Sequence, residues 1–333
     1  MQAVSEKTTL ARPAPSFLTS ILRQREFGIF AFVLLIFIGL TLAVPTFATT
    51  FNLLNMGRAM SELVVLGTAM TLLIISQELD LSVGSVYGLT SFAMGLLAQN
   101  HGVSLWIGLP VMLLVAAGIG LINGVITVYG RVPSFIVTLG MMGVLRGITL
   151  WLSPWPVNRI DDPSFFQFFG GRVPVLGINL PVQIIWMLLI MIIGVLILTR
   201  TQFGYQLRAT GSNRTAAELS GIPVKRTKIA AFMLTSMAAC IAGVFGFAHV
   251  NSVAPTAGTG IELMTIAAVV IGGTALFGGE GSVLGTFLGA MLLTILRNGL
   301  IQLGGDGRLI DTYIGIIIVA AVLIHTNVGR RRR

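Results

Sequence analysis

The sequence predicts an all-α polytopic membrane protein of about ten transmembrane helices, with both termini and one short helix in the cytoplasm. Of its 333 residues, 55% are hydrophobic and only 10% are charged, whereas soluble domains average about 25% charged residues. Apolar runs of roughly 18 residues or more recur along the chain, and each can cross a hydrocarbon core about 30 Å thick. The 40 glycines fit close approach between membrane helices.

The apolar runs divide the chain into two tails and one membrane domain. We expect a disordered cytoplasmic tail at 1–26, a transmembrane domain at 27–326 and a basic cytoplasmic tail at 327–333. The first run is too long for a cleaved signal peptide. The expected spans are 27–44, 53–76, 82–98, 105–128, 134–152, 181–198, 229–250, 263–277, 282–303 and 309–326. Glycines and acidic residues in 53–99 and 263–303 predict helices that break within the membrane.

Most of the positive charge lies on segments that this topology places in the cytoplasm. Fifteen of the 21 Lys and Arg residues are there: Lys7, Arg12, Arg23, Arg25, Arg131, Arg200, Arg208, Arg214, Lys225, Arg226, Lys228 and the arginines at 330–333. This distribution satisfies the positive-inside rule. The net charge of +9 is therefore explained by the orientation of the protein in the lipid bilayer. We expect no nucleic-acid partner.

The chain lacks the usual motifs of catalysis. It has one cysteine, Cys240, and its three histidines, His101, His249 and His325, are far apart, so we expect no disulfide within the chain and no metal site. There is no GxxxxGK[ST] phosphate loop, nucleophile elbow or HExxH pattern. We therefore expect no catalytic residues, no cofactor and no ATP hydrolysis by this chain. The sequence contains no candidate active site that would support an enzymatic function.

The polar run 200–228 separates two apolar runs and contains the signals of a short helix over 214–220. Ser212 or Asn213 can cap the start of the helix, and Gly221 can adopt the left-handed conformation that ends it. Ile222 can fold back onto Ala217, and Pro223 prevents the helix from continuing. A helix of about two turns is marginal alone in water. We therefore expect it to fit a socket on another subunit, the alternative being an ordinary positive-inside loop.

Part of this run, FGYQLRATGSNRTAAELSGIPV, resembles the cytoplasmic coupling segment of permease subunits in ribose-type ABC importers. The resemblance implies that the short helix docks in a groove on a separate ATPase subunit, which binds the ATP, and carries the closure of that subunit into the membrane. The coupling residues that it implies are Gly204, Gly211, Asn213, Ala216, Ala217, Ser220, Gly221 and Ile222.

Three further stretches extend the resemblance across about residues 75–300. They are ISQELDLSVGS at 75–85, FIVTLG at 135–140 with Arg146-Gly147 beyond, and IGGT at 271–274 through GGEGS at 278–282. In the first stretch the family typically has glycines where this chain has Gln77 and Glu78, and isoleucine in place of Leu79. The departure leaves the fold implied by the resemblance intact but puts an inherited substrate identity in doubt.

Polar residues within the apolar runs are candidates for the translocation path, because such residues are costly in a membrane and often functional. The candidates are Gln77, Glu78, Asp80, Asn123, Thr138 and Thr274. The alternative for Asp80 is a helix cap, and for Asn123 an interhelical hydrogen bond. Gly281, Gly285 and Gly289 recur on one helix face, which predicts tight packing.

Two weaker patterns concern the outer loop and an internal repeat. In the loop 153–180, the phenylalanines Phe165, Phe166, Phe168 and Phe169 near Trp151 and Trp155 predict an interfacial belt or plug. With Asp161 and Asp162 they are also candidates for a landing surface for a substrate-binding protein. The segment 84–88, GSVYG, echoes 281–285, GSVLG, which suggests a duplicated hairpin.

Together these features indicate the permease subunit of an importer for ribose or a related monosaccharide, multi-pass in the bacterial cytoplasmic (inner) membrane. The implied partners are an ATP-binding subunit, a second permease copy as homodimer or paralogue heterodimer, and a periplasmic or lipid-tethered sugar-binding protein. Alternatives of the same class are permeases for a branched-chain amino acid, a nucleoside or a furanone signal. An ion-coupled secondary transporter using Glu78 or Asp80 is the alternative from another class.

Overall fold

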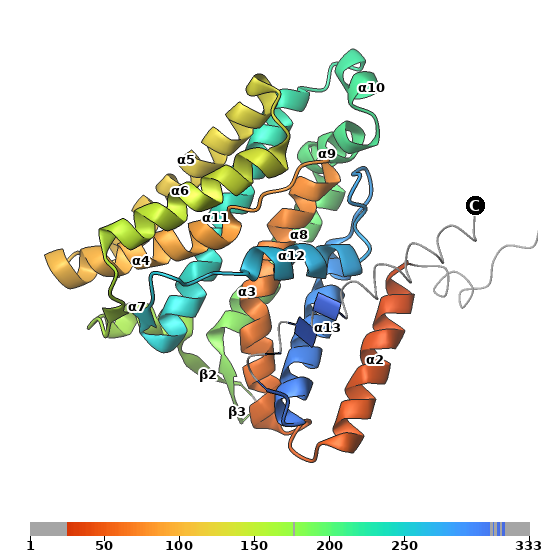
Figure 1. The fold of residues 1–333 in the computed structure, drawn as a ribbon. Helices are drawn as coiled ribbons and strands as arrows, with labels where there is room; N and C mark the ends of the chain where they lie inside the picture. The colour runs from red at the N-terminus through yellow and green to blue at the C-terminus, as the bar shows by residue number, and fades with distance from the viewer. Residues whose placement is uncertain (1–24, 176, 307–308, 310–311, 314, 317–333) are drawn as a thin grey trace, which may run out of the picture.

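The computed structural model describes residues 25–175, 177–306, 309, 312–313 and 315–316, and it consists mainly of helices (Figure 1). The expected tails at 1–26 and 327–333 lie almost wholly outside the described residues. The helices are α2 (Arg25–Ala43), α3 (Thr50–Ile75), α4 (Val83–His101), α5 (Leu105–Gly130), α6 (Ser134–Leu152), α7 (Pro163–Gly170), α8 (Val182–Arg200), α9 (Gln202–Ser212), α10 (Arg214–Leu219), α11 (Val224–Val250), α12 (Ile261–Ile271) and α13 (Val283–Gln302). Two antiparallel strand pairs are short: β1 (Val157–Asn158) with β4 (Ser252–Val253), and β2 (Arg172–Val175) with β3 (Ile178–Pro181).

Seven helices of the described part are long and apolar enough to cross a membrane: α2, α3, α5, α6, α8, α11 and α13. The other expected spans differ. Helix α4 has 19 residues but a less apolar sequence than these seven. The span expected at 263–277 is wrong, because α12 has 11 residues and covers about 17 Å, well short of the hydrocarbon core. The span expected at 309–326 lies largely outside the described residues.

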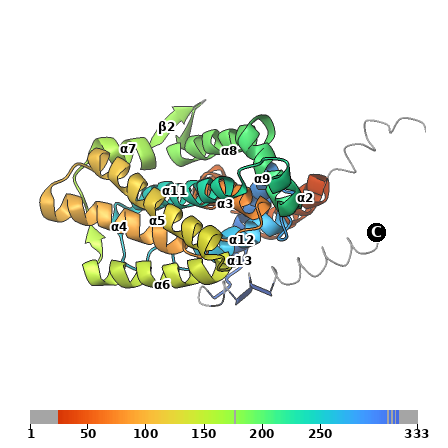
Figure 2. The same ribbon diagram turned by 90° about the horizontal axis from the view of Figure 1, so that it is seen from above.

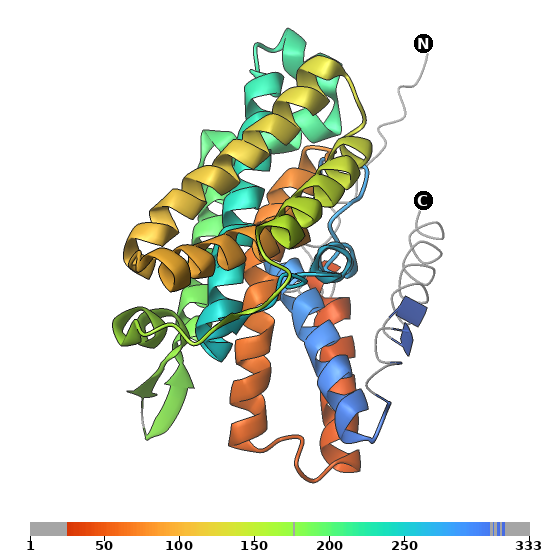
Figure 3. The ribbon, with the colours of Figure 1, turned by 60° about the vertical axis from the view of Figure 1, so that its left-hand side comes forward.

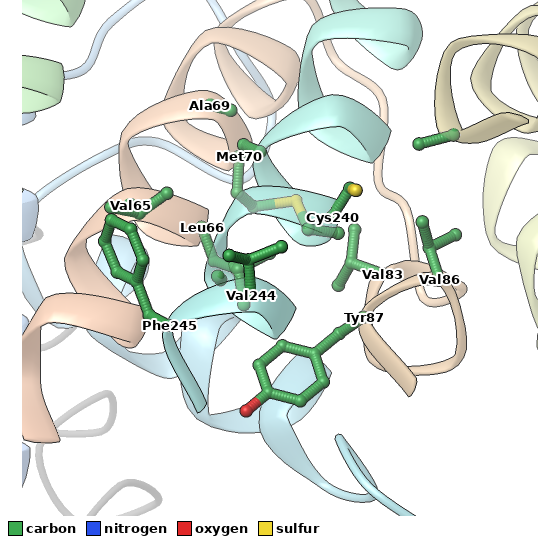
Figure 4. Close-up of a cluster of buried hydrophobic side chains, with 14 of the residues drawn as sticks. Val65, Leu66, Ala69, Met70, Val83, Val86, Tyr87, Cys240, Val244 and Phe245 are labelled. Atoms are coloured by element: carbon green, nitrogen blue, oxygen red, sulfur yellow. The ribbon is translucent and has the colours of Figure 1, made fainter. Parts of the chain in front are cut away.

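Helices α3 and α11 form the centre of the structure, with α8 on one side and α6 on the other (Figure 2). Buried side chains from α3, α4 and α11 make one cluster, which includes Met70, Val86 and Val244 (Figure 4). Glycines bring the backbones together: a Cβ atom on Gly120 of α5 would lie 2.6 Å from the carbonyl oxygen of Phe232. Small residues therefore allow the close helix packing that the composition predicts.

Two helical segments are interrupted, as the glycines and acidic residues predict. The chain leaves α3 at Ile75 and resumes with α4 at Val83, and it leaves α12 at Ile271 and resumes with α13 at Val283. We call the segments 76–82 and 272–282 the first and second helix breaks. Helix α12 lies across the long helices rather than along them (Figures 1 and 3).

The proposed internal echo has the wrong register. Ser82 and Ser282 both precede a helix as its N-cap residue. The echo paired Gly84, which lies inside α4, with Gly281, which precedes the N-cap of α13. The two helix starts correspond only when Ser82 is paired with Ser282, which also pairs Asp80 with Glu280. The short glycine match is thus not a structural equivalence.

Gly285 and Gly289 lie on α13 and pack on α12, which confirms the packing interpretation for these two glycines. Gly281 precedes the N-cap of α13 and packs against Ile75 instead. A Cβ atom on Gly285 would overlap the carbonyl oxygen of Gly272, and one on Gly289 would overlap that of Ala268. Ser282 Oγ caps α13 by accepting a 3.2 Å hydrogen bond from the N–H of Gly285. The short α12 is therefore fixed against α13 at backbone distance.

The aromatic residues of α7 pack into one cluster, but with other tryptophans than expected. The ring of Phe165 is fully buried and lies 5.3 Å from that of Trp106, while Phe168 lies 5.2 Å from Trp186. Trp151 and Trp155 are 83% and 75% exposed, so they do not belong to this cluster. The prediction chose the tryptophans nearest in sequence, whereas the fold brings Trp106 of α5 and Trp186 of α8 to α7.

Candidate coupling site and polar cavity

Helix α10 has the start and stop that the sequence predicts. Asn213, rather than Ser212, is the N-cap, and its Oδ1 accepts a 3.0 Å hydrogen bond from the N–H of Ala216. Gly221 adopts φ +79°, and the N–H of Ile222 donates a 3.0 Å hydrogen bond to the carbonyl of Ala217. The helix lies at one end of the molecule (Figure 1). These local signals therefore define a short, exposed helix.

We did not predict helix α9, which precedes α10 within the same polar run. Thr201 caps it by accepting a 3.2 Å hydrogen bond from the N–H of Gly204. Its buried residues Gly204, Leu207 and Gly211 recur at helical spacing. This spacing after a threonine cap was the available signal. A Cβ atom on Gly204 would overlap the carbonyl of Ile197, so α9 folds tightly back onto α8.

The end of α9 touches both helix breaks. A Cβ atom on Gly211 would overlap the carbonyl oxygen of Ile75 and lie 2.6 Å from the nitrogen of Gly279. Nε2 of Gln77 donates hydrogen bonds to the carbonyls of Gly211 at 2.9 Å and Phe277 at 2.6 Å. The segment that carries α10 is thus in direct contact with the first and the second break.

A buried ion pair joins the first break to α11. Nζ of Lys228 lies 2.5 Å from Oε1 of Glu78, and the two side chains are 7% and 12% exposed. Glu78 also lines a cavity of about 430 Å³ together with Arg131 and Arg214. By contrast, the ion pair of α10 itself, Arg214 with Glu218 at 3.1 Å, is exposed.

Three predicted path residues lie together around the first break and bond to its backbone or side chains. Oδ1 of Asp80 accepts hydrogen bonds from the N–H and Oγ of Ser82 at 2.8 and 2.6 Å. Nδ2 of Asn123 donates to Oγ of Ser82 at 3.0 Å, and Oγ1 of Thr138 accepts from the N–H of Leu81 at 3.0 Å. Breaking a helix leaves backbone donors without partners, and Asp80 and Thr138 each satisfy one of them. Thr274 is separate from this group, buried in the second break.

A larger cavity of about 660 Å³ lies between α3, α4, α12 and α13, and it contains charged residues that we did not single out. Arg58 and Glu62, one turn apart on α3, line it. Oε2 of Glu62 accepts a 2.9 Å hydrogen bond from the hydroxyl of Tyr87. Two ionisable residues inside the expected span 53–76 were the available signal, since such residues are rare in membrane helices.

Comparison with known proteins identifies the family. Residues 52–324 match the family described as branched-chain amino acid transport system / permease component. The chain belongs to this permease family. The resemblance to ribose-type permeases is confirmed, and the chain is a multi-pass transport subunit of the inner membrane.

This permease is similar to several importer permeases. The ribose import permease protein RbsC of Escherichia coli K12 is 37% identical over 320 residues, which cover 95% of this chain and 98% of the relative. RbsC of Bacillus subtilis is 35% identical, covering 90% and 92%. The autoinducer 2 import system permease protein LsrC of Enterobacter sp. is 34% identical, covering 83% and 79%. No solved structure matches the chain.

Proposed function

We propose that this permease carries ribose or a related monosaccharide across the inner membrane, driven by ATP hydrolysis on a separate subunit. The observation that supports the coupling most directly is the contact of Gly211 with both helix breaks, because it connects the exposed α10 to the interrupted helices. The substrate class follows the names of the relatives, several of which are ribose import permeases. The permease itself uses no cofactor, and its partner binds the ATP.

In this proposal α10 is the ATPase-docking element. Leu219 is 85% exposed on α10, and an exposed apolar side chain on a short helix suits a groove on a partner. The buried coupling residues have a different task. Gly204 and Gly211 allow α9 to pack on α8 and the breaks. Closure of the ATPase then displaces α10 and α9, and the displacement reaches both breaks directly.

The distribution of charge supports a cytoplasmic position for α9 and α10. Arg131, Arg200 and Lys225 lie at or next to the helix ends on this side, at the ends of α5 and α8 and the start of α11. Positive residues near membrane helix ends favour the cytoplasm. In this proposal both termini are cytoplasmic, and the loops around α7 face outward.

The proposed assembly contains two permease copies, identical or paralogous, which form the pore. A tandem ATPase clamps α10 of each copy, and a binding protein delivers the sugar to the outer face. Asp161 is exposed there and available to that protein, whereas Asp162 uses its carboxylate to cap α7, accepting from the N–H of Phe165 at 3.2 Å.

Reconstitution with the separate partners tests the proposal. Proteoliposomes that contain the permease, its ATPase and the binding protein should accumulate labelled ribose only with ATP. Uptake without the ATPase that collapses with an uncoupler would instead establish an ion-coupled transporter. The structure gives no support to that alternative, because Glu78 is paired with Lys228 and Asp80 is hydrogen-bonded to Ser82.

A further inference from the structure

We infer that the cavity between α3, α4, α12 and α13 is the solute-binding station of the membrane domain, and that Arg58, Glu62 and Tyr87 recognise an uncharged solute rich in hydroxyl groups there. This inference rests on the proposed function and extends it by naming the recognising residues. It differs from the path predicted from the sequence, whose residues cluster at the helix breaks.

Two charged residues of α3 line this cavity. Arg58 and Glu62 lie inside α3, a helix that is long and apolar enough to cross a membrane. Ionisable residues in membrane helices are expensive and usually serve a function. Nε of Arg58 is buried without a hydrogen-bond partner among the described residues. The guanidinium also lines the cavity, where its exposed N–H groups can donate to a ligand oxygen.

Glycines of neighbouring segments leave room for the side chain of Tyr87. A Cβ atom on Gly246 of α11 would overlap the hydroxyl of Tyr87, so only glycine leaves room for it there. The ring belongs to the buried cluster, while its hydroxyl points out of that cluster (Figure 4). The hydroxyl bonds Glu62 at 2.9 Å, which fixes the carboxylate at the cavity wall.

The loop 257–260 forms the rim of the cavity. Gly84 and Gly88 of α4 allow this loop to approach, since a Cβ atom on Gly88 would lie 2.5 Å from the carbonyl oxygen of Ala257. Nη1 of Arg146 donates a 2.9 Å hydrogen bond to that same carbonyl. Oε1 of Glu262 accepts a 3.2 Å hydrogen bond from the N–H of Gly260. Side chains from α6 and α12 thus hold the rim in place.

The chemistry of the wall suits a sugar. Carboxylate, guanidinium and phenol groups together accept and donate hydrogen bonds, which is what vicinal hydroxyl groups require. Leu63, Met264 and Leu293 supply apolar surface for the carbon face of the ring. Arg58, Arg297 and Glu62 line the cavity, and Arg146 and Glu262 hold its rim, so both hydrogen-bond donors and acceptors surround the solute. The volume of about 660 Å³ lies within the range of ligand pockets.

A cysteine-protection experiment tests the inference on the full chain in membranes with its partners. Ala59 is exposed at the cavity wall, and Ala48 is exposed in the turn between α2 and α3. The native Cys240 is fully buried, so it should contribute little labelling by N-ethylmaleimide. D-ribose should slow the labelling of Ala59→Cys several-fold and leave the matched control Ala48→Cys unchanged.

Substitutions in the same background identify the recognising groups. Glu62→Gln should weaken protection by about tenfold or more in ribose concentration, because a hydrogen bond to a charged group is lost. Tyr87→Phe keeps the packing and should weaken it less, and it serves as the test if Glu62→Gln does not fold. Unchanged protection in both variants would overturn the assignment.

Three other outcomes are decisive. Protection by leucine but not by ribose would overturn the substrate class. Protein that imports ribose with ATP but shows no protection would overturn the cavity assignment while leaving the proposed function intact. Absence of both ATP-driven ribose import and protection would overturn the two proposals together.

Discussion

The N–H of Gly279 donates a 2.9 Å hydrogen bond to the carbonyl oxygen of Ile75, and so joins the second helix break to the end of α3. Gly211 of α9 lies against the same carbonyl, at a distance that leaves no room for a side chain. Three segments far apart in the sequence therefore meet around one peptide group. This joint connects the proposed docking helix with both interrupted helices.

The substitution Gly211→Ala should disrupt the joint. The added methyl group overlaps the carbonyl of Ile75, and overpacking of this kind typically costs about 1–3 kcal/mol. We expect uptake in proteoliposomes to fall while the complex still hydrolyses ATP. Gly118→Ala on α5 is the control, because its Cβ atom meets open space. Fully coupled uptake by Gly211→Ala would contradict the role of this contact.

The substitution Gly221→Val should abolish transport and leave membrane insertion intact. Gly221 has φ +79° and no atom within 4 Å of an added Cβ, so the penalty comes from the backbone alone, because β-branched residues rarely adopt this conformation. Measurement of uptake and of protein in the membrane fraction separates the two effects. Gly39→Val, in an open position on α2, should transport normally.

Proline at position 217 should have the same result as Gly221→Val for a different reason. Ala217→Pro removes the 3.0 Å hydrogen bond from the N–H of residue 217 to the carbonyl of Asn213, and proline inside a helix costs about 3 kcal/mol. In a six-residue helix this cost prevents its formation. Normal ATP-dependent uptake by this variant would refute the docking and coupling role proposed for α10.

Removing one partner of the Lys228–Glu78 pair should destabilise the permease. Lys228→Met leaves a carboxylate that is only 12% exposed without its cation, and breaking such a pair costs about 3–5 kcal/mol. The melting temperature in detergent should fall, and the double variant with Glu78→Gln should recover part of the loss. Lys225→Met, at an exposed lysine over the Tyr129 ring, should cost at most about 1 kcal/mol.

Leu219→Ser should weaken association with the ATPase subunit without affecting the stability of the permease itself. The side chain is 85% exposed in the isolated chain, and burying a leucine on binding contributes about 1.5–3 kcal/mol. Co-purification and a titrated binding assay should show the loss. Leu219→Met, which keeps an apolar side chain of similar size, should bind nearly as well; equal binding by Leu219→Ser would exclude Leu219 from the interface.

The sequence predicts α10 correctly because its signals are local: Asn213, Gly221 and Ile222 act on neighbouring backbone groups. It does not predict the end of α12, because the apolar residues Leu276 and Phe277 continue the run beyond the helix. Hydropathy records apolar side chains, whereas the break depends on backbone conformation, such as φ +89° at Gly273.

The sequence predicts some residues of the candidate site but not the contacts between them. Gln77, Glu78 and Asp80 were identified as polar residues in a membrane segment, but their partners Gly211, Lys228 and Ser82 follow only partly from sequence proximity. The cavity could not be foreseen, because Glu62, Tyr87 and Gly260 come together only when α3, α4 and α12 pack. Only the presence of charges in α3 was visible beforehand.

Gln77 adopts φ +67° although it is not glycine, and its side-chain amide holds two carbonyls from other segments. The ribose-type pattern has glycine here, which would adopt this conformation with less strain but could not form either bond. The first break in this chain is consequently a rigid connection between α3 and α4 rather than a hinge. A displacement that reaches the break through α9 is therefore transmitted as movement of whole helices, because the break itself bends little.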